Sequence, residues 1–212
     1  MEEHPGSRGT YNDIANWIAP DFFFSRSDGW ARMGFLGVFA DFVLYGTAGD
    51  VLEIGVGESS IYLAKVAKKY GRRIYHCEIS PGKIDNPLTI PGYLEPEISV
   101  FYRQGSDKMF EEALTPLALG FIDGDHLYPQ VKKDFYNALD RLVDNGYIIL
   151  HDTYPPDESY VNENRCGTVY KLRQEIEKDP GLDCITLPRG CAMGVGFTIV
   201  RKKPKQRAYY NE

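Results

Sequence analysis

Cysteine is scarce in this sequence, and no apolar run is long enough to cross a bilayer. The four cysteines form no CxxC pair, and free thiols are favoured over a bridge between Cys184 and Cys191 across a hairpin. The first ten residues are polar and lack the apolar centre of a signal peptide. The most apolar segment, 33–44, is short and is interrupted by Asp41. These features predict a cytoplasmic protein without a membrane span, and a buried helix over 30–45.

A surplus of positive charge is also missing. The net charge is −6 and the isoelectric point is near 5.3, whereas binding to nucleic acid or to a membrane surface needs clustered lysine and arginine. The one basic cluster, at 201–207, fits a solvated C-terminal tail. We therefore expect neither nucleic acid nor a membrane as a partner.

The chain has enough apolar and aromatic residues for one substantial core. Of its 212 residues, 43% are hydrophobic and 13% are aromatic, which suits one main domain better than two. Apolar residues at 22–24 are compatible with a homodimer. The sequence predicts four parts: a disordered N-terminus at 1–10, cap helices at 11–48, the main domain at 49–203 and the basic tail at 204–212.

Short apolar runs alternate with helical patterns from residue 50 onward. Strands are expected at 51–54, 74–77, 99–102, 119–122 and 147–150. Helices are expected at 60–70, at 111–114, from Pro129 to a stop at Gly146, and at 168–178. Four prolines make a helix improbable across 80–96, and a hairpin of 183–187 and 194–201 closes the chain. This order predicts a doubly wound α/β fold with a mostly parallel, seven-stranded sheet and an antiparallel edge strand.

Acidic residues recur where the predicted strands end. In an open α/β sheet, ligands bind outside the carboxyl ends of the strands, so these ends should meet at one site. The residues found there are Glu53 to Gly57, Glu78, Gly105 with Ser106, Asp123 to His126, and His151 with Asp152.

The first of these strand ends has the pattern of a strand, a tight turn and a helix start. Gly55 and Gly57 would let the backbone approach a ligand, and Ser59 and Ser60 can cap the following helix. The N-terminus of that helix favours an anionic or polar group. A carboxylate at Glu53 would repel a pyrophosphate but can accept a hydrogen bond from the ammonium group of an amino-acid ligand. Glu53 therefore argues against a nicotinamide dinucleotide.

Glu53-Ile54-Gly55-Val56-Gly57 resembles the first motif of class I S-adenosylmethionine-dependent methyltransferases, with Ser59 in the place of a third glycine. Glu78 matches the acid that binds the ribose in that family, and Gly105 with Ser106 matches the lining of the adenine pocket. The resemblance thus implies a Rossmann-like methyltransferase fold in the main domain. It implies that S-adenosylmethionine is held by Glu53, Gly55, Gly57, Ser59, Ser60, Glu78, Gly105, Ser106 and Asp123.

The segments 121–126 and 149–153 are similar to the branch of metal-dependent O-methyltransferases that includes catechol-type and macrolide-sugar enzymes. That resemblance implies magnesium held by Asp123 and Asp152. Thr153 stands where the catechol-type enzymes have Asn, so the third protein ligand is left open, and His151 suits magnesium poorly because this ion prefers oxygen. His126 lies three residues after Asp123, where the macrolide-sugar enzymes have their base, which implies the same role here.

The sequence therefore predicts a methyltransferase acting on a hydroxyl of a small molecule, a sugar or a phenol, with divalent-metal assistance. Two alternatives stay open: a nicotinamide-dependent oxidoreductase and a non-catalytic protein that binds the cofactor. At single residues, Asp125 could cap a helix, His126 could be structural, and Asp123 with Asp152 could lack a metal.

Overall fold

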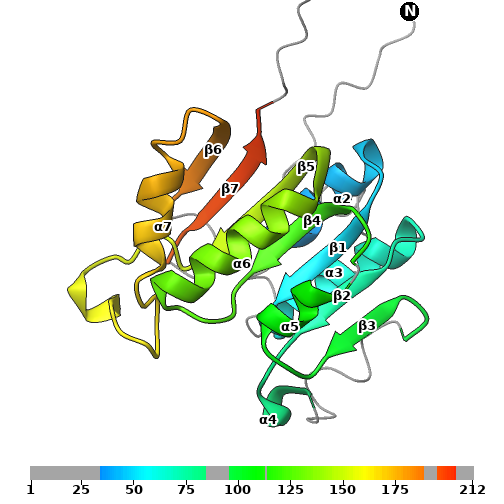
Figure 1. The fold of residues 1–212 in the computed structure, drawn as a ribbon, viewed down its shortest axis with the longest axis horizontal. Coiled ribbons are helices and arrows are strands. Elements are labelled where there is room, and N and C mark those ends of the chain that lie inside the picture. Colours follow the sequence, from blue (N-terminus) through cyan, green and yellow to red (C-terminus); the bar gives the residue numbers. More distant parts are fainter. Residues whose placement is uncertain (1–33, 85–95, 113, 189–194, 204–212) are drawn as a thin grey trace, which may run out of the picture.

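A computed structural model describes residues 34–84, 96–112, 114–188 and 195–203. Its centre is a seven-stranded sheet with the strand order β3-β2-β1-β4-β5-β7-β6 (Figure 1). The strands are β1 (Asp50–Ile54), β2 (Ile74–Cys77), β3 (Ser99–Tyr102), β4 (Leu117–Ile122), β5 (Leu142–His151), β6 (Leu182–Leu187) and β7 (Phe197–Lys202).

The first five strands are parallel, and the C-terminal hairpin is antiparallel. β1 pairs with β2 and β4, β2 with β3, and β4 with β5, all in parallel register. β7 runs antiparallel to both β5 and β6, so the hairpin inserts its second strand beside β5 and leaves β6 at the edge. The predicted α/β class, with a mostly parallel sheet and an antiparallel edge pairing, is confirmed.

Helices cover both faces of the sheet (Figure 1). Val51 and Phe121 belong to a core cluster that includes residues of α2 (Gly34–Gly46) and α3 (Glu58–Lys69). Leu52 and Ile54, on the alternate positions of β1, belong to a second cluster on the other face. That face is covered by α5 (Ser106–Glu111), α6 (Tyr128–Arg141) and α7 (Val169–Ile176).

The strand β5 begins earlier than the sequence suggests. The sequence predicts a helix that continues to the stop at Gly146, but α6 ends at Arg141 and Leu142 is already paired with Leu117 of β4. The prediction of a helix opened by Pro129 is confirmed, because this proline stands in the first turn of α6.

Three helix predictions were wrong in their details. The helix expected at 111–114 lies at Ser106–Glu111, directly after the turn at Gly105. A four-residue helix, α4 (Pro81–Ile84), begins inside the proline-rich segment, because a proline is tolerated in the first turn of a helix. The helix α2 is not covered on every face, since Phe42 and Tyr45 are 66% and 82% exposed.

Several predictions fall on residues outside those described: the N-terminal parts at 1–10 and 11–33, the apolar residues 22–24, Cys191 and the basic tail. Within the described ranges, no helix is both long and apolar enough to cross a membrane.

Candidate active site

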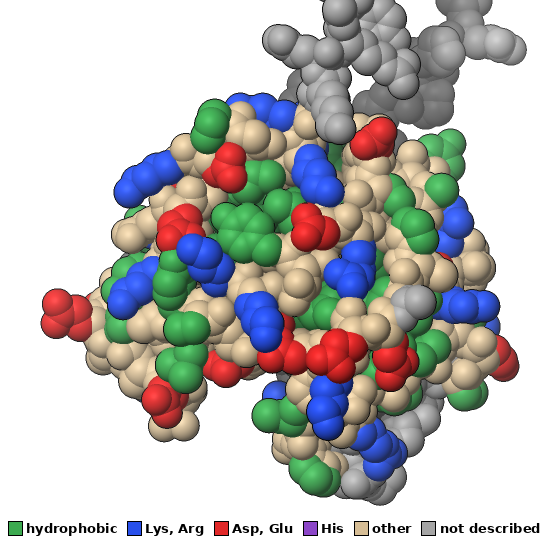
Figure 2. All heavy atoms as spheres, in the orientation of Figure 1, with side chains coloured by type: hydrophobic (Ala, Val, Ile, Leu, Met, Phe, Trp, Pro, Cys, Tyr) green, Lys and Arg blue, Asp and Glu red, His purple; other side chains and the backbone are tan. Residues whose placement is uncertain are grey.

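The carboxyl ends of the parallel strands meet at the lower edge of the sheet in Figure 1. In the same orientation, Figure 2 shows Asp and Glu side chains gathered along this edge. They lie beside a notch between the region around α4 and the remainder of the molecule. The acids that the sequence places at strand ends therefore lie at one rim of the molecule, as expected for an open α/β sheet.

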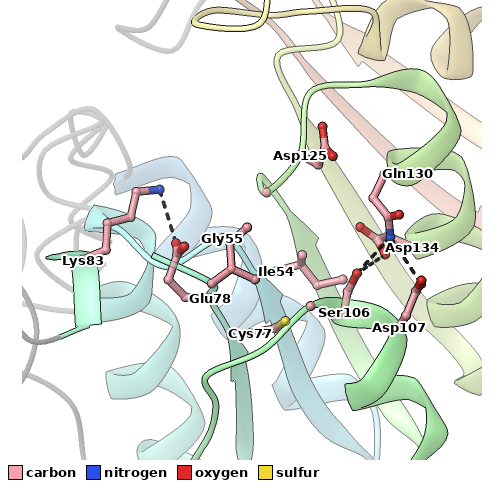
Figure 3. Close-up of a pocket in the computed structure, with 13 residues that line it drawn as sticks. Ile54, Gly55, Cys77, Glu78, Lys83, Ser106, Asp107, Asp125, Gln130 and Asp134 are labelled. Atoms are coloured by element: carbon pink, nitrogen blue, oxygen red, sulfur yellow. Dashed lines mark hydrogen bonds and ion pairs between the residues drawn. The ribbon is translucent and has the colours of Figure 1, made fainter. Parts of the chain in front are cut away.

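A cavity of about 330 Å³ opens at the ends of β1 and β2 and at the start of α5 (Figure 3). Four predicted cofactor residues, Gly55, Glu78, Gly105 and Ser106, are in its wall. Its volume lies at the lower end of the range for small-molecule sites. The remaining wall residues are Ile54, Cys77, Ile79, Lys83, Asp107, Gly124, Asp125, Gln130 and Asp134.

Glu78 is fixed at one end of this cavity. Its Oε2 accepts a hydrogen bond from the backbone N–H of Val56 at 3.2 Å, and its Oε1 accepts one from the N–H of Ser80 at 2.7 Å. Lys83 lies 3.3 Å from Oε2 (Figure 3). The carboxylate is 7% exposed at the end of β2. These contacts fix the position of the carboxyl oxygens, which can accept hydrogen bonds from hydroxyl donors.

The two glycines after β1 differ in what surrounds them. Gly55 has a φ of +89°, and a Cβ there would lie 2.0 Å from the carbonyl oxygen of Asp123, so the turn packs against the end of β4. A Cβ on Gly57 would meet no atom of the described residues within 4 Å. The N–H of Gly57 donates to Oγ of Ser60 at 3.1 Å, which closes the first turn of α3. Gly55 is therefore needed by the fold, while open space lies beside Gly57.

Glu53 is buried between the sheet and α3. Its two oxygens lie 2.5 Å from Oγ of Ser59, which donates, and 2.6 Å from Nδ1 of His76. Glu53 is completely buried and is not part of the cavity wall. The predicted contact of Glu53 with the amino group of a cofactor has no support in this geometry and stays a prediction, as do those of Ser59 and Ser60.

Two polar residues that the sequence did not single out stand at the other end of the cavity. Asp134 is 1% exposed, and its Oδ1 accepts hydrogen bonds from Oγ of Ser106 at 2.6 Å and from Nε2 of Gln130 at 3.0 Å (Figure 3). Burial raises the pKa of Asp134 more than these two donors lower it. Gln130 and Asp134 are four residues apart on α6, beside its apolar stripe, and this spacing was the sequence signal that could have indicated their contact.

The ends of β4 and β5 bring Asp123, His126 and Asp152 together. Nε2 of His126 lies 3.4 Å from Oδ1 of Asp123 and 3.3 Å from Oδ2 of Asp152. One ligand-type atom from each of the three residues lies within 4.8 Å of the others. Asp152 has a φ of +56°, which is unusual for a residue with a side chain and typical of functional sites. This group is the only such cluster among the described residues.

His151 supports this cluster from the side. Its Nδ1 lies 3.0 Å from Oδ1 of Asp123 and 3.4 Å from Oδ1 of Asp152, and its side chain is 4% exposed. Burial alone would lower the pKa of His151, but the charge and the hydrogen bond of Asp123 outweigh it and raise the pKa. The hydrogen bond with Asp123 likewise raises the pKa of His126.

The two carboxylates of the cluster differ in acidity. Burial would raise the pKa of Asp123, but the charge of His151 and the hydrogen bonds from both histidines hold it well below its usual range. Burial dominates at Asp152 and raises its pKa above the usual value.

The orientation of His126 depends on the loop after β5. Nδ1 of His126 is hydrogen-bonded to the backbone carbonyl of Arg165, and the carbonyl of His126 accepts from the N–H of Thr168 at 2.8 Å. A Cβ on Gly167 would lie 2.2 Å from that same carbonyl. The sequence could not indicate these contacts, because they run through the main chain. The alternative role of Asp125 as a helix cap was wrong: Leu127 is the N-cap of α6 and has no side-chain cap, and Oδ1 of Asp125 accepts instead from the N–H of Leu127 itself.

A second cavity, of about 390 Å³, surrounds this cluster. It shares Lys83 and Gly124 with the first cavity, so the two lie side by side. Its wall contains Lys83, Asp123, Gly124, His126, His151, Asp152, Tyr160, Arg165, Cys166 and Val195.

Residues 52–153 match a protein family described as a methyltransferase domain. No curated protein sequence matches the chain. Several solved structures share its fold. A putative O-methyltransferase from Klebsiella pneumoniae is 18% identical, with a TM-score of 0.65 over 92% of this chain and 91% of that one.

Two further neighbours were solved with a cofactor or its product. An O-methyltransferase from Bacillus cereus in complex with S-adenosylhomocysteine is 21% identical, with a TM-score of 0.62 over 91% of this chain and 87% of the other. The O-methyltransferase TomG from Streptomyces achromogenes, in complex with S-adenosylmethionine, is 17% identical, with a TM-score of 0.61 over 93% and 92%. Residues 52–153 therefore match a methyltransferase domain, and the chain has the Rossmann-like fold of these solved methyltransferases.

Proposed function

We propose that the chain is an S-adenosylmethionine-dependent O-methyltransferase that methylates a hydroxyl of a small molecule, a sugar or a phenol, with the help of a divalent cation. The observation that carries this proposal is the pair of adjoining cavities. One contains the strand-end residues that suit a nucleoside, the other contains the Asp123, His126 and Asp152 cluster, and Lys83 and Gly124 lie in both walls. A donor and an acceptor would thus meet at the shared wall.

The first cavity fits the cofactor in its chemistry. Glu78 offers a fixed carboxylate for ribose hydroxyls, and Ser106 offers a 7% exposed hydroxyl at the other end. The open space beside Gly57 leaves room for a ligand near the N-terminus of α3. The cofactor complexes of the B. cereus and Streptomyces neighbours support this assignment.

The cluster fits a divalent cation in its donor set, which consists of two carboxylates and an imidazole nitrogen. When bound, S-adenosylmethionine supplies the methyl group and a divalent cation lowers the pKa of a coordinated hydroxyl. The residues around the cluster orient the groups that would bind the cation. Nδ1 of His151 donates to Asp123 and fixes the direction of that carboxylate.

In the neutral ring, Nε2 of His126 has two possible roles in the reaction. Nδ1 faces the carbonyl of Arg165 and carries the proton, so Nε2 has the free lone pair of the neutral ring. That lone pair can accept the proton of the acceptor hydroxyl, as the sequence predicts, or it can bind the cation.

A nicotinamide cofactor is less well supported. The sequence-based argument against it was the charge of Glu53, and this argument loses force because Glu53 points to the α3 side of the sheet. The decision rests instead on the family match and on the cluster at Asp123, which a hydride transfer does not need.

Calorimetric titration with S-adenosylhomocysteine tests the proposal. We expect binding to the wild-type chain and a loss of about tenfold to hundredfold in affinity for Glu78→Gln, because a hydrogen bond to a charged group is worth about 1.5–3 kcal/mol. Glu97→Gln is the matched control, since the Glu97 side chain is 73% exposed and not part of either cavity wall. Thermal unfolding of each variant shows whether it is folded.

No binding of S-adenosylhomocysteine to the wild-type chain at millimolar concentration would end the proposal, and stabilisation by NAD instead would favour the oxidoreductase. Methyl transfer to a panel of sugars and phenols then separates an enzyme from a binding protein, because a protein that only binds the cofactor forms no methylated product.

A further inference from the structure

We propose that His126 is the third protein ligand of the cation held by Asp123 and Asp152, and that the site takes an ion that accepts imidazole nitrogen, such as Mn²⁺, in preference to Mg²⁺. This inference rests on the proposed function only in assuming that a cation binds there. It assigns the ligand that the sequence left open and moves His126 from the role of base to that of ligand.

The hydrogen bonds of His126 fix which nitrogen faces the cluster. A carbonyl oxygen can only accept, so Nδ1 must donate to the carbonyl of Arg165. In the neutral ring, Nε2 then points a lone pair at oxygens of Asp123 and Asp152, 3.4 and 3.3 Å away. Because three electron-rich atoms that face one another repel, this arrangement needs either a proton on Nε2, shared with Asp123, or a cation between the three atoms, and their spacing is one that can hold a metal ion. A histidine that binds a metal through one nitrogen and donates the other N–H to a backbone carbonyl is the usual arrangement in metal sites.

His151 is less suited to bind the ion, although it is equally close. Among the described residues, its buried Nε2 has no hydrogen-bond partner. If Nδ1 bound the ion, the proton would have to be on Nε2, where a buried N–H would find no acceptor. With the proton on Nδ1, His151 donates to Oδ1 of Asp123 at 3.0 Å and orients this carboxylate.

Thr153 is turned away from the cluster. Its Oγ1 accepts a hydrogen bond from Oγ1 of Thr198 on β7 at 2.9 Å, and Thr153 is completely buried. The residue that follows Asp152 therefore does not supply the third donor. Within the described part of the chain, His126 is the residue that completes a set of three.

The donor set decides the ion. Mg²⁺ takes oxygen ligands and releases its waters reluctantly, whereas Mn²⁺ and the later divalent ions of the first transition row accept imidazole more readily. A site that offers one imidazole with two carboxylates should therefore bind Mn²⁺ more tightly than Mg²⁺, and His126 should be the cause of the difference.

Electron paramagnetic resonance of Mn²⁺ added to the metal-free full chain tests this without any measurement of activity. We expect one bound Mn²⁺ whose pulsed spectrum shows coupling to a histidine ¹⁴N, displaced only by about a hundredfold excess of Mg²⁺. His126→Ala should remove the ¹⁴N coupling and weaken Mn²⁺ binding by about tenfold or more, with little change for Mg²⁺. His151→Ala is the matched control and should keep the coupling.

A bound Mn²⁺ without nitrogen coupling in the wild-type protein would overturn the inference, as would a coupling that survives His126→Ala and disappears in His151→Ala. A wild-type spectrum without nitrogen coupling refutes the inference even if a variant does not fold. Calorimetry with S-adenosylhomocysteine on the same samples separates the two proposals, because cofactor binding without Mn²⁺ binding refutes the inference and leaves cofactor binding intact.

Discussion

Glu53 lies on the α3 side of the sheet because side chains alternate along a strand. Val51 and Glu53 point to the face of α2 and α3, while Leu52 and Ile54 point to the other face, where the cavity wall includes Ile54. His76, paired with Glu53 in the parallel register, points the same way. The sequence motif places an acid two residues before the first glycine. Because this position faces α3 and not the cavity, Glu53 forms hydrogen bonds with Ser59 and His76.

Asp134 leads to a prediction about pH. Its pKa is raised in the folded state, so the native chain binds this proton more tightly than the unfolded chain, and stability is lost as the pH rises above the unfolded value of 3.8 through the folded pKa. Asp134→Asn should therefore increase the free energy of unfolding at pH 7 by on the order of 1 kcal/mol, the scale of burying a polar group. The gain should shrink as the pH falls toward 3.8. Urea unfolding between pH 4.5 and 7.5 measures it.

Asp107 provides a control of opposite sign. It lies 2.7 Å from Lys133 on the surface, and this hydrogen bond lowers its pKa. Asp107→Asn should lower stability slightly at pH 7, by less than about 1 kcal/mol, since the pair is exposed. If Asp134→Asn were the less stable of the two at pH 7, the account of Asp134 as a buried charge with neutral partners would be wrong.

At the scale of elements, the turn between β1 and α3 makes the glycines unequal. Gly55→Ala would place a Cβ against the carbonyl of Asp123 at a positive φ, so we expect a loss of about 2–4 kcal/mol in the free energy of unfolding. Gly57→Ala faces open space and should cost about 1 kcal/mol or less, the difference between glycine and alanine as an N-cap. Chemical denaturation of both variants measures the contrast. Equal losses would show that Gly55 is not a packing requirement.

The sequence predicted an element accurately where nearby residues determine its bounds, and inaccurately where contacts with distant residues determine them. The bounds of β2 and β3 were confirmed, because short segments with three apolar or aromatic residues in four, set between polar segments, define them locally. The start of β5 was wrong, because Leu142 is extended through its pairing with Leu117, a contact that no local pattern encodes. The six residues of α5 carry too weak a periodicity to be located, and the turn at Gly105 sets their start.

For the site, the sequence was informative where strand ends set the geometry. Asp123, His126 and Asp152 come together because β4 and β5 are parallel neighbours. The partners of His126 could not be predicted, since backbone carbonyls leave no signature in the side chains. Asp134 was missed because a carboxylate on an otherwise amphipathic helix is expected to face solvent.

At the scale of the whole molecule, burial is greatest in the middle of the sheet. β4 is buried along its whole length and β1 along nearly all of it, whereas Val100 and Phe101 of the edge strand β3 are each 37% exposed. We expect amide hydrogen exchange to be slowest in β4 and β1 and at least about a hundredfold faster in β3. Mass spectrometry of exchanged peptides checks this order. Equal protection of β3 would mean that another surface covers this edge.

The His126 ring is oriented by a hydrogen bond to the backbone carbonyl of Arg165 and not by the Arg165 side chain. Any amino acid at position 165 can supply that oxygen if the loop keeps its path, except that proline would remove the N–H that donates to the carbonyl of Asn162 at 3.0 Å. The guanidinium of Arg165, which lies 4.4 Å from the centre of the Tyr160 ring, is thus free to be exchanged. In the proposed methyltransferase, mutations in this wall would change the preference for the acceptor without turning the His126 ring, so the two properties can evolve separately.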